Sequence, residues 1–282
     1  MSSTKIAVNL QEPHHHPSAG FATRLEPHDD REQEEILRSA AEARQTSLVA
    51  ARLDRYLDPQ PDTPYPLEYA FYLGGDLRDR VVVELGCGSG ENLLIAAQRG
   101  GRVTGIDISP DLLSLADSRL KLAGATARLR EASAYDTGLP SASVDVVFCI
   151  AILHHLELPR ARAEILRILR PNGMVIVSEP VRDSKIYDRV RRLFRVRTEE
   201  DSFFERPLTS AVLSEFAAGF TRTARRRFRL PLIPLLHWAG SERSPRIWRL
   251  DRWLLRDLPV LQRYATIEVS RLECPPDPSA VV

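Results

Sequence analysis

Three glycines at alternate positions, Gly86, Gly88 and Gly90, follow a short apolar run that is typical of a buried strand. Because glycine has no Cβ, backbone at such a turn can pass close to a ligand. A helical pattern follows directly, and the free N–H groups at the start of that helix would point into the turn. Asp107 ends a second apolar run, twenty-one residues after Gly86. At this spacing an acidic residue reaches ribose hydroxyls in a nucleotide-binding βαβ unit, so these residues predict a nucleotide site.

The spacing of the glycines narrows the choice of nucleotide. A dinucleotide fingerprint reads G-x-G-x-x-G and requires glycine at position 91. This chain has Glu91 there, whose bulk and negative charge disfavour a pyrophosphate, so an NAD-dependent enzyme is the weaker alternative. The pattern that is present, E-x-G-x-G-x-G starting at Glu84, resembles motif I of the class I S-adenosylmethionine-dependent methyltransferases.

Further motifs extend this resemblance over about residues 67–180. The stretch Leu153-His154-His155-Leu156 looks like the "LHHL" segment of one subgroup of the family. Residues 169–173 resemble the family's leucine-x-proline-glycine-glycine turn, with Asn172 in place of the first glycine. Asparagine tolerates a left-handed backbone, so this departure is mild. A stronger departure is Ser133, which stands where the family often has aspartate beside the adenine ring.

The resemblance implies S-adenosylmethionine as cofactor and no metal. Its carboxypropyl end would lie across the glycine turn, its ribose hydroxyls on Asp107, and its adenine against the loop that contains Ser133. The backbone N–H of Ala134 would face the ring. The residues expected to bind the cofactor are Glu84, Gly86, Cys87, Gly88, Gly90, Asp107, Ile108, Ser133, Ala134, Tyr135, Cys149 and Ile150.

Three titratable side chains lie where open α/β sheets bind their substrates, at the carboxyl ends of strands. His154 and His155 follow the fourth predicted strand, and Glu179 ends the fifth. Histidine titrates near neutrality and can take a proton from a hydroxyl or phenol. We expect one histidine to act as a general base, with His155 ahead of His154. The alternative is that an imidazole only caps the following segment or bonds to backbone.

The acceptor is less well defined. Many methyltransferases of this fold that act on nucleic acids or glutamine carry Asn/Asp-Pro-Pro-Tyr after the fourth strand, whereas this chain has residues 149–152, Cys-Ile-Ala-Ile. This favours an oxygen or carbon acceptor, or an aliphatic amine, in a small molecule such as a secondary metabolite, a quinone or a lipid-like compound. The alternative function is a non-catalytic protein that keeps the fold and only binds S-adenosylmethionine or a nucleoside.

The pattern of apolar runs and helical periodicities predicts an α/β protein. It favours a Rossmann-like, mostly parallel sheet of seven strands with helices on both faces. Strands are predicted at 81–85, 102–106, just before Ser133, and at 143–150, 174–178, 220–230 and 265–270. Helices are predicted at 92–98, 112–120 (with Ser109 as N-cap), 162–169 and 208–216.

The chain divides into four predicted regions. Residues 1–30 are rich in proline and histidine and predict a disordered arm. Residues 31–66 predict a helical cap with a long helix at 32–57. Residues 67–273 are expected to form the methyltransferase domain, in which 182–261 is an insertion that begins with a basic amphipathic helix and forms a lid over the acceptor. The alternatives for this insertion are a packing extension or dimer surface, and attachment to a membrane surface through the amphipathic helix. Residues 274–282 predict a loose tail.

Composition limits the partners. Lys and Arg number 39 against 38 Asp and Glu, but residues 181–282 hold 20 against 13, a net charge of +7. This excess is modest for a nucleic-acid footprint, so no nucleic acid is expected. No run of 18 apolar residues is present, and no membrane insertion is expected. Three cysteines without C-x-x-C spacing favour the reducing cytoplasm and argue against zinc. Whether the chain forms a homodimer is left open.

Overall fold

The computed structural model describes residues 30–45, 53–184, 208–231 and 245–276. Most of the predicted N-terminal arm, the amphipathic helix around 186–194 and the tail beyond residue 276 lie outside the described residues. The account below concerns the described ranges.

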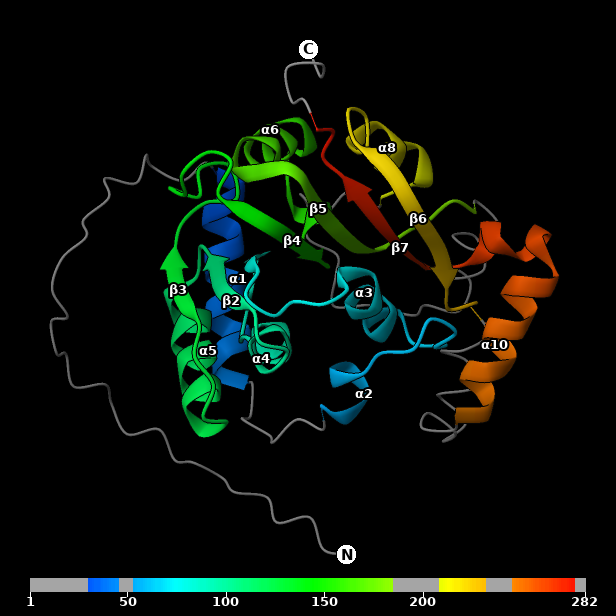
Figure 1. Cartoon of the computed structure of the whole chain (residues 1–282), viewed down its shortest axis with the longest axis horizontal. Helices are drawn as coiled ribbons and strands as arrows, with labels where there is room; N and C mark the ends of the chain where they lie inside the picture. Colours follow the sequence, from blue (N-terminus) through cyan, green and yellow to red (C-terminus); the bar gives the residue numbers. More distant parts are fainter. Residues whose placement is uncertain (1–29, 46–52, 185–207, 232–244, 277–282) are drawn as a thin grey trace, which may run out of the picture.

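A seven-stranded sheet forms the centre of the molecule, in the order β3-β2-β1-β4-β5-β7-β6 (Figure 1). Neighbours from β3 through β5 pair in parallel, whereas β7 is antiparallel to both β5 and β6. This confirms the predicted Rossmann-like, mostly parallel sheet. The strands are β1 Val81–Leu85, β2 Arg102–Asp107, β3 Arg128–Glu131, β4 Val144–Ile150, β5 Leu169–Pro180, β6 Thr221–Phe228 and β7 Ile267–Glu273.

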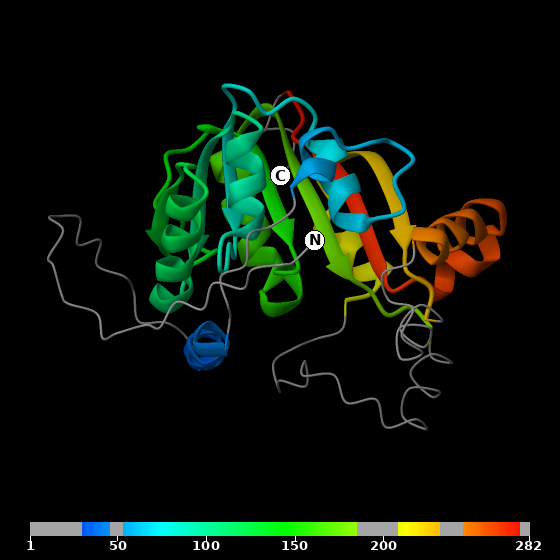
Figure 2. The same cartoon turned by 90° about the horizontal axis from the view of Figure 1, so that it is seen from below.

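Helices cover both faces of the sheet, as predicted (Figure 2). On one face lie α3, α4 and α5; on the other lie α6 and α8. α10 packs beside β6 at one edge, and α1 lies against α5. The helices are α1 Asp30–Gln45, α2 Asp54–Leu57, α3 Pro66–Gly74, α4 Glu91–Gln98, α5 Pro110–Leu122, α6 Leu158–Ile168, α8 Ser210–Phe216 and α10 Pro245–Asp257, with short 3₁₀ helices η1 Leu153–His155 and η3 Pro259–Tyr264.

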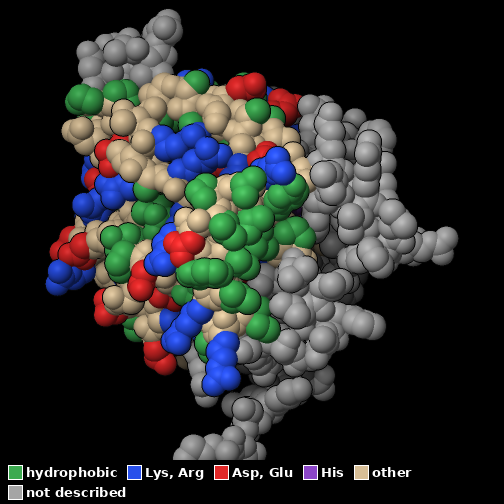
Figure 3. Space-filling view, turned by 90° about the vertical axis from the view of Figure 1, so that its right-hand side faces the viewer, with side chains coloured by type: hydrophobic (Ala, Val, Ile, Leu, Met, Phe, Trp, Pro, Cys, Tyr) green, Lys and Arg blue, Asp and Glu red, His purple; other side chains and the backbone are tan. Residues whose placement is uncertain are grey.

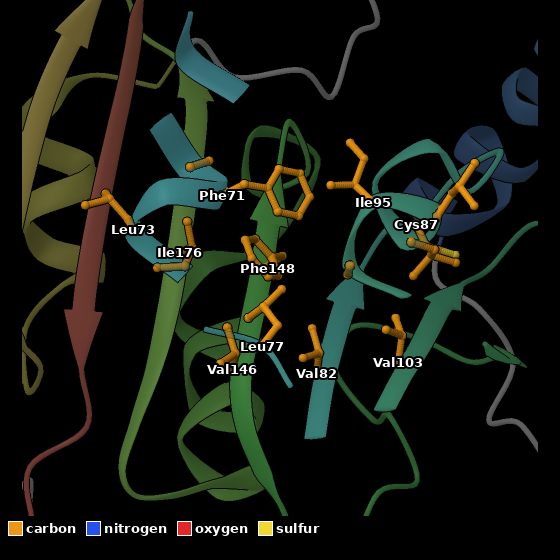
Figure 4. Packing of buried hydrophobic residues seen from close by; sticks show 14 of the residues in the cluster. Phe71, Leu73, Leu77, Val82, Cys87, Ile95, Val103, Val146, Phe148 and Ile176 are labelled. Carbon is orange, nitrogen blue, oxygen red and sulfur yellow. The ribbon is translucent and has the colours of Figure 1, made fainter. Parts of the chain in front are cut away.

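The central strands are apolar on both faces because helices bury both. Val82 points into the layer under α3 and α4, and the next residue, Val83, points into the layer under α6. Figure 4 shows the first layer, where Phe71 of α3 packs on Phe148 of β4 with ring centroids 5.0 Å apart. Burying an aromatic side chain of this size contributes roughly 2–3 kcal/mol. This packing fixes the strand ends that carry the polar residues described below.

The structure corrects three predicted boundaries. The helix expected from residue 162 begins at Leu158, because Pro159 fits the first turn of a helix, where no N–H bond is needed. The fifth strand begins at Leu169 rather than 174, and the register shifts beside Asn172, whose φ of 62° is left-handed as expected. The continuous helix predicted over 32–57 is wrong, since Leu53 is not helical and precedes α2.

The insertion expected at 182–261 contains parts of the main fold. Both α8 and β6 lie within this span, and β6 is an edge strand of the sheet. The described residues of this span that lie outside the sheet and its covering helices are mainly α10 and η3. Among the helices that the structure describes, none combines the length and the apolar character needed to cross a membrane.

Candidate functional site

The glycine turn between β1 and α4 has the left-handed backbone that its sequence requires. The φ angles of Gly86, Gly88 and Gly90 are 65°, 50° and 80°. A Cβ on Gly86 would lie 2.4 Å from the side chain of Ile152, and one on Gly90 would lie 2.7 Å from Ala116. A Cβ on Gly88 would meet no atom of the described residues within 4 Å. Packing therefore explains two of the glycines, whereas the third faces open space.

Asp107 ties the end of β2 to this turn. Its Oδ2 accepts a hydrogen bond from the backbone N–H of Gly88 at 2.8 Å, and its Oδ1 accepts from Ser109 at 2.9 Å. Burial raises the pKa of Asp107, while these two backbone bonds act in the opposite direction. Each carboxylate oxygen keeps a second lone pair for a ligand hydroxyl. Ser109 also caps α5 through its side chain, as predicted.

Glu84, at the end of β1, is a buried carboxyl with one unsatisfied oxygen. Its Oε1 accepts from Asn92 Nδ2 at 2.7 Å, whereas its Oε2 is buried and has no hydrogen-bond partner among the residues that the structure describes. Burial raises the pKa of Glu84 to about 8, and the neighbouring Asp107 adds to the shift. A buried acceptor without a donor is costly, so this oxygen is well suited to a cationic ligand group.

We expect Glu84 to make the ligand-free protein less stable as pH rises from 5 to 8. The folded protein keeps a proton on Glu84 up to about pH 8, but the unfolded chain loses it near the ordinary value of 4.5. Since the folded state binds up to one more proton over this range, the free energy of unfolding falls, by at most about 1.4 kcal/mol per pH unit.

Urea unfolding at several pH values checks this expectation. Glu84→Gln keeps an acceptor for Asn92 and should remove the part of the slope that Glu84 causes. The exposed Glu157 offers a matched control, and Glu157→Gln should keep the wild-type slope. An unchanged slope in Glu84→Gln would show that Glu84 does not carry the proton.

A cavity of about 60 Å³ lies between the turn, the end of β2 and the cap helix α1. This is small beside the roughly 300–1,000 Å³ of most ligand pockets, because α1 lies across its opening. Several residues expected to contact a ligand line it. The lining residues are Arg31, Glu32, Glu35, Ser39, Gly86, Ile106, Asp107, Ile108, Ala132, Ala134, Tyr135, Ile152, His155 and Leu156.

Other expected site residues lie around this cavity rather than on its wall. Cys149 is fully buried in the layer under α6, and Ile150 packs against the opposite layer. Ser133 bonds to Glu32 of α1 through its hydroxyl, which also accepts from the N–H of Tyr135. The remaining residues of this group are Glu84, Cys87, Gly88, Gly90, His154 and Glu179.

His154, which is partly buried, pairs with the fully buried Glu179 across the ends of β4 and β5. Nδ1 of His154 lies 2.8 Å from Oε2 of Glu179, which is fully buried. The other oxygen of Glu179 accepts from the N–H groups of Ile152 and Leu153, at 2.8 and 2.7 Å. A carboxylate held in this way accepts a bond from Nδ1–H and leaves Nε2 as the basic nitrogen. Nε2 of His154 makes no hydrogen bond to the part of the chain that the structure describes.

His155 faces the other way, towards the cap helix. Its Nδ1 lies 3.3 Å from Oε2 of Glu35, and it lines the cavity beside Asp107. Burial alone would raise the pKa of Glu35, but the hydrogen bond and charge of His155 lower it below the ordinary value. Arg31 of α1 also donates to the carbonyl of His154. The sequence did not indicate that α1 contributes to the site.

The two histidines therefore occupy different sides of the site. His154 reaches towards β5, and His155 reaches towards α1 and the cavity at β2. Their ring centroids lie only 4.0 Å apart. Within the described residues, no group of three or more His, Cys, Asp and Glu side chains is arranged to hold a metal ion.

Comparison with known proteins gives three kinds of match. Residues 83–177 match the model of a methyltransferase domain family. The chain is 30% identical over 164 residues to the ubiquinone biosynthesis O-methyltransferase of Nitrosomonas europaea, a match that covers 55% of this chain and 69% of that protein. It is 31% identical over 149 residues to an uncharacterized Synechococcus protein, of which it spans 36%. The chain thus spans only part of these relatives.

Solved structures show the same fold. The geranyl diphosphate C-methyltransferase from Streptomyces coelicolor A3(2), crystallised with S-adenosyl-L-homocysteine, superimposes with a TM-score of 0.59. The alignment covers 88% of this chain and 99% of that one, at 16% sequence identity. At this identity the likeness concerns the fold alone.

Proposed function

Since this chain belongs to the class I S-adenosylmethionine-dependent methyltransferases, we propose that it transfers a methyl group to a hydroxyl oxygen of a small molecule. The observation that supports this proposal is the His154–Glu179 pair, in which the hydrogen bond at Nδ1 leaves Nε2 of His154 as the basic nitrogen. Curated relatives with the name ubiquinone biosynthesis O-methyltransferase support an oxygen acceptor. A carbon acceptor, as used by the Streptomyces C-methyltransferase, is the second candidate.

The residues around the glycine turn fit S-adenosylmethionine. The open space beside Gly88 would accept the methionine part, and the unsatisfied oxygen of Glu84 suits a cationic group. Asp107 would hold the ribose hydroxyls, with Ile108 and Ala134 beside the adenine. When bound, the cofactor supplies an electrophilic methyl group on a sulfonium. The small cavity implies that α1 shifts to admit a ligand of this size.

Replacement of Asp107 should weaken cofactor binding. A charge-assisted hydrogen bond contributes roughly 1.5–3 kcal/mol before desolvation. Asp107→Ala should therefore raise the dissociation constant of S-adenosylmethionine at least about tenfold, measured by calorimetry. Because Asp107 also holds Gly88 and Ser109, the melting temperature of the variant must be recorded as a control. Unchanged affinity in a folded variant would contradict the assignment.

The proposed catalytic step is removal of a proton from the acceptor hydroxyl. Glu179 fixes the imidazole of His154 with Nδ1 protonated, so that Nε2 can accept the proton as the oxygen becomes nucleophilic. Two backbone N–H groups hold Glu179 in place, which keeps the pair rigid. We assign His155 instead to contact with the cap helix through Glu35.

A product screen tests the proposal. The protein is incubated with S-adenosylmethionine and a metabolite extract, and mass spectrometry looks for compounds that gain one methylene. Binding of the cofactor without any methylated product would favour the alternative, a protein that binds S-adenosylmethionine or a nucleoside without catalysis.

We also propose that the protein works in the reducing cytoplasm, because Cys87, Cys149 and Cys274 are all buried free thiols.

A further inference from the structure

A second cavity, of about 430 Å³, lies at the edge of the sheet between β6, α10 and η3. Figure 3 shows this side of the molecule, where Lys and Arg side chains gather beside a hydrophobic patch. The wall of this cavity holds six arginines and a single acidic residue. The lining residues are Asp183, Arg225, Arg226, Arg227, Arg252, Leu255, Arg256, Gln262 and Arg263.

Three of these arginines have acidic partners. Arg225 lies 2.8 Å from Glu268, and Arg227 pairs with Glu268 and Asp183. Arg256 pairs with its chain neighbour Asp257. The ion pairs that Arg225 and Arg227 form with Glu268 are held in place, because Glu268 is fully buried and Arg227 is nearly so.

The other three arginines are not neutralised. Within the described residues, Arg226, Arg252 and Arg263 form no ion pair with a carboxylate. Arg226 donates to two backbone carbonyls and stacks on Tyr69, so it adds charge but few donors. Burial lowers its pKa to about 10, and repulsion by Arg252 contributes. Nε of Arg226 and Nε of Arg252 are both buried without a hydrogen-bond partner in the part of the chain that the structure describes. The cavity therefore concentrates positive charge and guanidinium groups whose hydrogen bonds are incomplete.

We propose that this arginine cavity binds the phosphate or diphosphate group of the methyl acceptor. Guanidinium groups bind phosphate oxygens through paired N–H donors, and several together match a multiply charged anion better than a single carboxylate. Three arginines without acidic partners balance the charge of a diphosphate. The proposal that the cavity binds an anion depends only on the arginines. The proposal that this anion is part of the methyl acceptor rests on the proposed methyl transfer.

The sheet register connects this cavity to the proposed base. Glu179 on β5 pairs with Glu268 on β7, which pairs with Arg227 on β6. Residues that face one another in antiparallel pairs share a face of the sheet, so this row runs from Glu179, the partner of His154, to Arg227 on the wall of the cavity. Two strand spacings separate Glu179 from Arg227, about 10 Å. A small molecule with an anionic head could span that distance and present a hydroxyl near His154.

Binding of inorganic pyrophosphate tests the anion site. Calorimetry at constant ionic strength should show saturable binding to the full-length protein. Arg252→Gln should weaken it at least about tenfold, because one charge-assisted contact is lost. Arg263→Gln, on the exposed η3, provides a second variant should the first fail to fold. Arg246→Gln is the matched control, since Arg246 lies on the same helix but does not line the cavity.

Several outcomes would overturn the proposal. Equal, non-saturable binding to the wild type and Arg252→Gln would show that no anion site exists. The exposed side chains of Leu250 and Trp253 on α10 make an anionic lipid headgroup another source of phosphate. Sedimentation with anionic phospholipid vesicles that depends on Arg252, without pyrophosphate binding, would replace the small molecule by a membrane.

The link to the acceptor has its own readout. Saturating pyrophosphate should inhibit methyl transfer without displacing S-adenosylmethionine. Bound pyrophosphate with no inhibition would overturn the link while leaving the anion site. Pyrophosphate binding should persist in His154→Ala, so failure of the proposed function and failure of this site are distinguishable.

Discussion

His154→Ala should lower the turnover number by about 10²–10⁴-fold and leave the affinity for S-adenosylmethionine nearly unchanged. General-base assistance contributes this factor when a hydroxyl must lose its proton as the methyl group arrives. The side chain of His154 is held by Glu179 on β5 and does not line the cavity beside Asp107. Steady-state kinetics with the methylated acceptor, together with calorimetry of the cofactor, checks both parts.

Two further variants make this result specific. Glu179→Gln should also lower turnover, because the amide cannot hold Nδ1 in the same charged hydrogen bond. His155→Ala should act mainly on cofactor affinity, since His155 lines the cavity and contacts Glu35. If His154→Ala and His155→Ala both turn over at the wild-type rate, neither is a base. The acceptor would then be a carbon or an already basic amine.

Gly88→Val should abolish detectable cofactor binding in a protein that still folds. The added side chain meets no atom of the described residues within 4 Å and would enter the space assigned to the methionine part of the cofactor. Its cost to the fold is that of a left-handed backbone at φ 50°, about 1–2 kcal/mol. We expect the affinity for S-adenosylmethionine to fall by two orders of magnitude or more, as measured by calorimetry.

Gly124 offers a matched control. It has a φ of 62° and open space where a Cβ would lie, but it follows α5, away from the glycine turn. Gly124→Val should lower the melting temperature by a similar amount and keep wild-type affinity. Full affinity in Gly88→Val would show that the turn is not the cofactor cradle.

The parts of the fold around the candidate site that the sequence predicted are local. The strand, glycine turn, helix and second strand from Val81 to Asp107 follow one another within a single βαβ unit. Side-chain type and spacing alone therefore placed Asp107 against the turn, where it bonds to Gly88. Apolar runs also identified the strands of the sheet, because both faces are buried.

The pairing of His154 with Glu179 depends on tertiary structure and could not be predicted. These residues lie 25 positions apart, and the register between β4 and β5 decides whether they meet. Nothing in the sequence pattern distinguishes two adjacent histidines. The preference for His155 over His154 as the base therefore had no structural basis. In the structure, a turn of 3₁₀ helix directs one ring towards β5 and the other towards α1.

Long-range contacts also explain the features that sequence reasoning missed. Glu35 meets His155 across 120 positions, so the contribution of α1 to the cavity leaves no local signal. The excess of basic residues in the C-terminal part was visible in the composition and was interpreted only as too small for a nucleic-acid footprint. Folding instead gathers arginines from β6, α10 and η3 around one cavity.

One measurement tests the central claim most directly. The protein is incubated with S-adenosylmethionine that carries a deuterated methyl group and with a metabolite extract, and mass spectrometry follows both products. Our account predicts equal amounts of S-adenosylhomocysteine and a small molecule that carries the intact deuterated methyl group, both strongly reduced in His154→Ala. Tight binding of S-adenosylmethionine with no S-adenosylhomocysteine formed would contradict it.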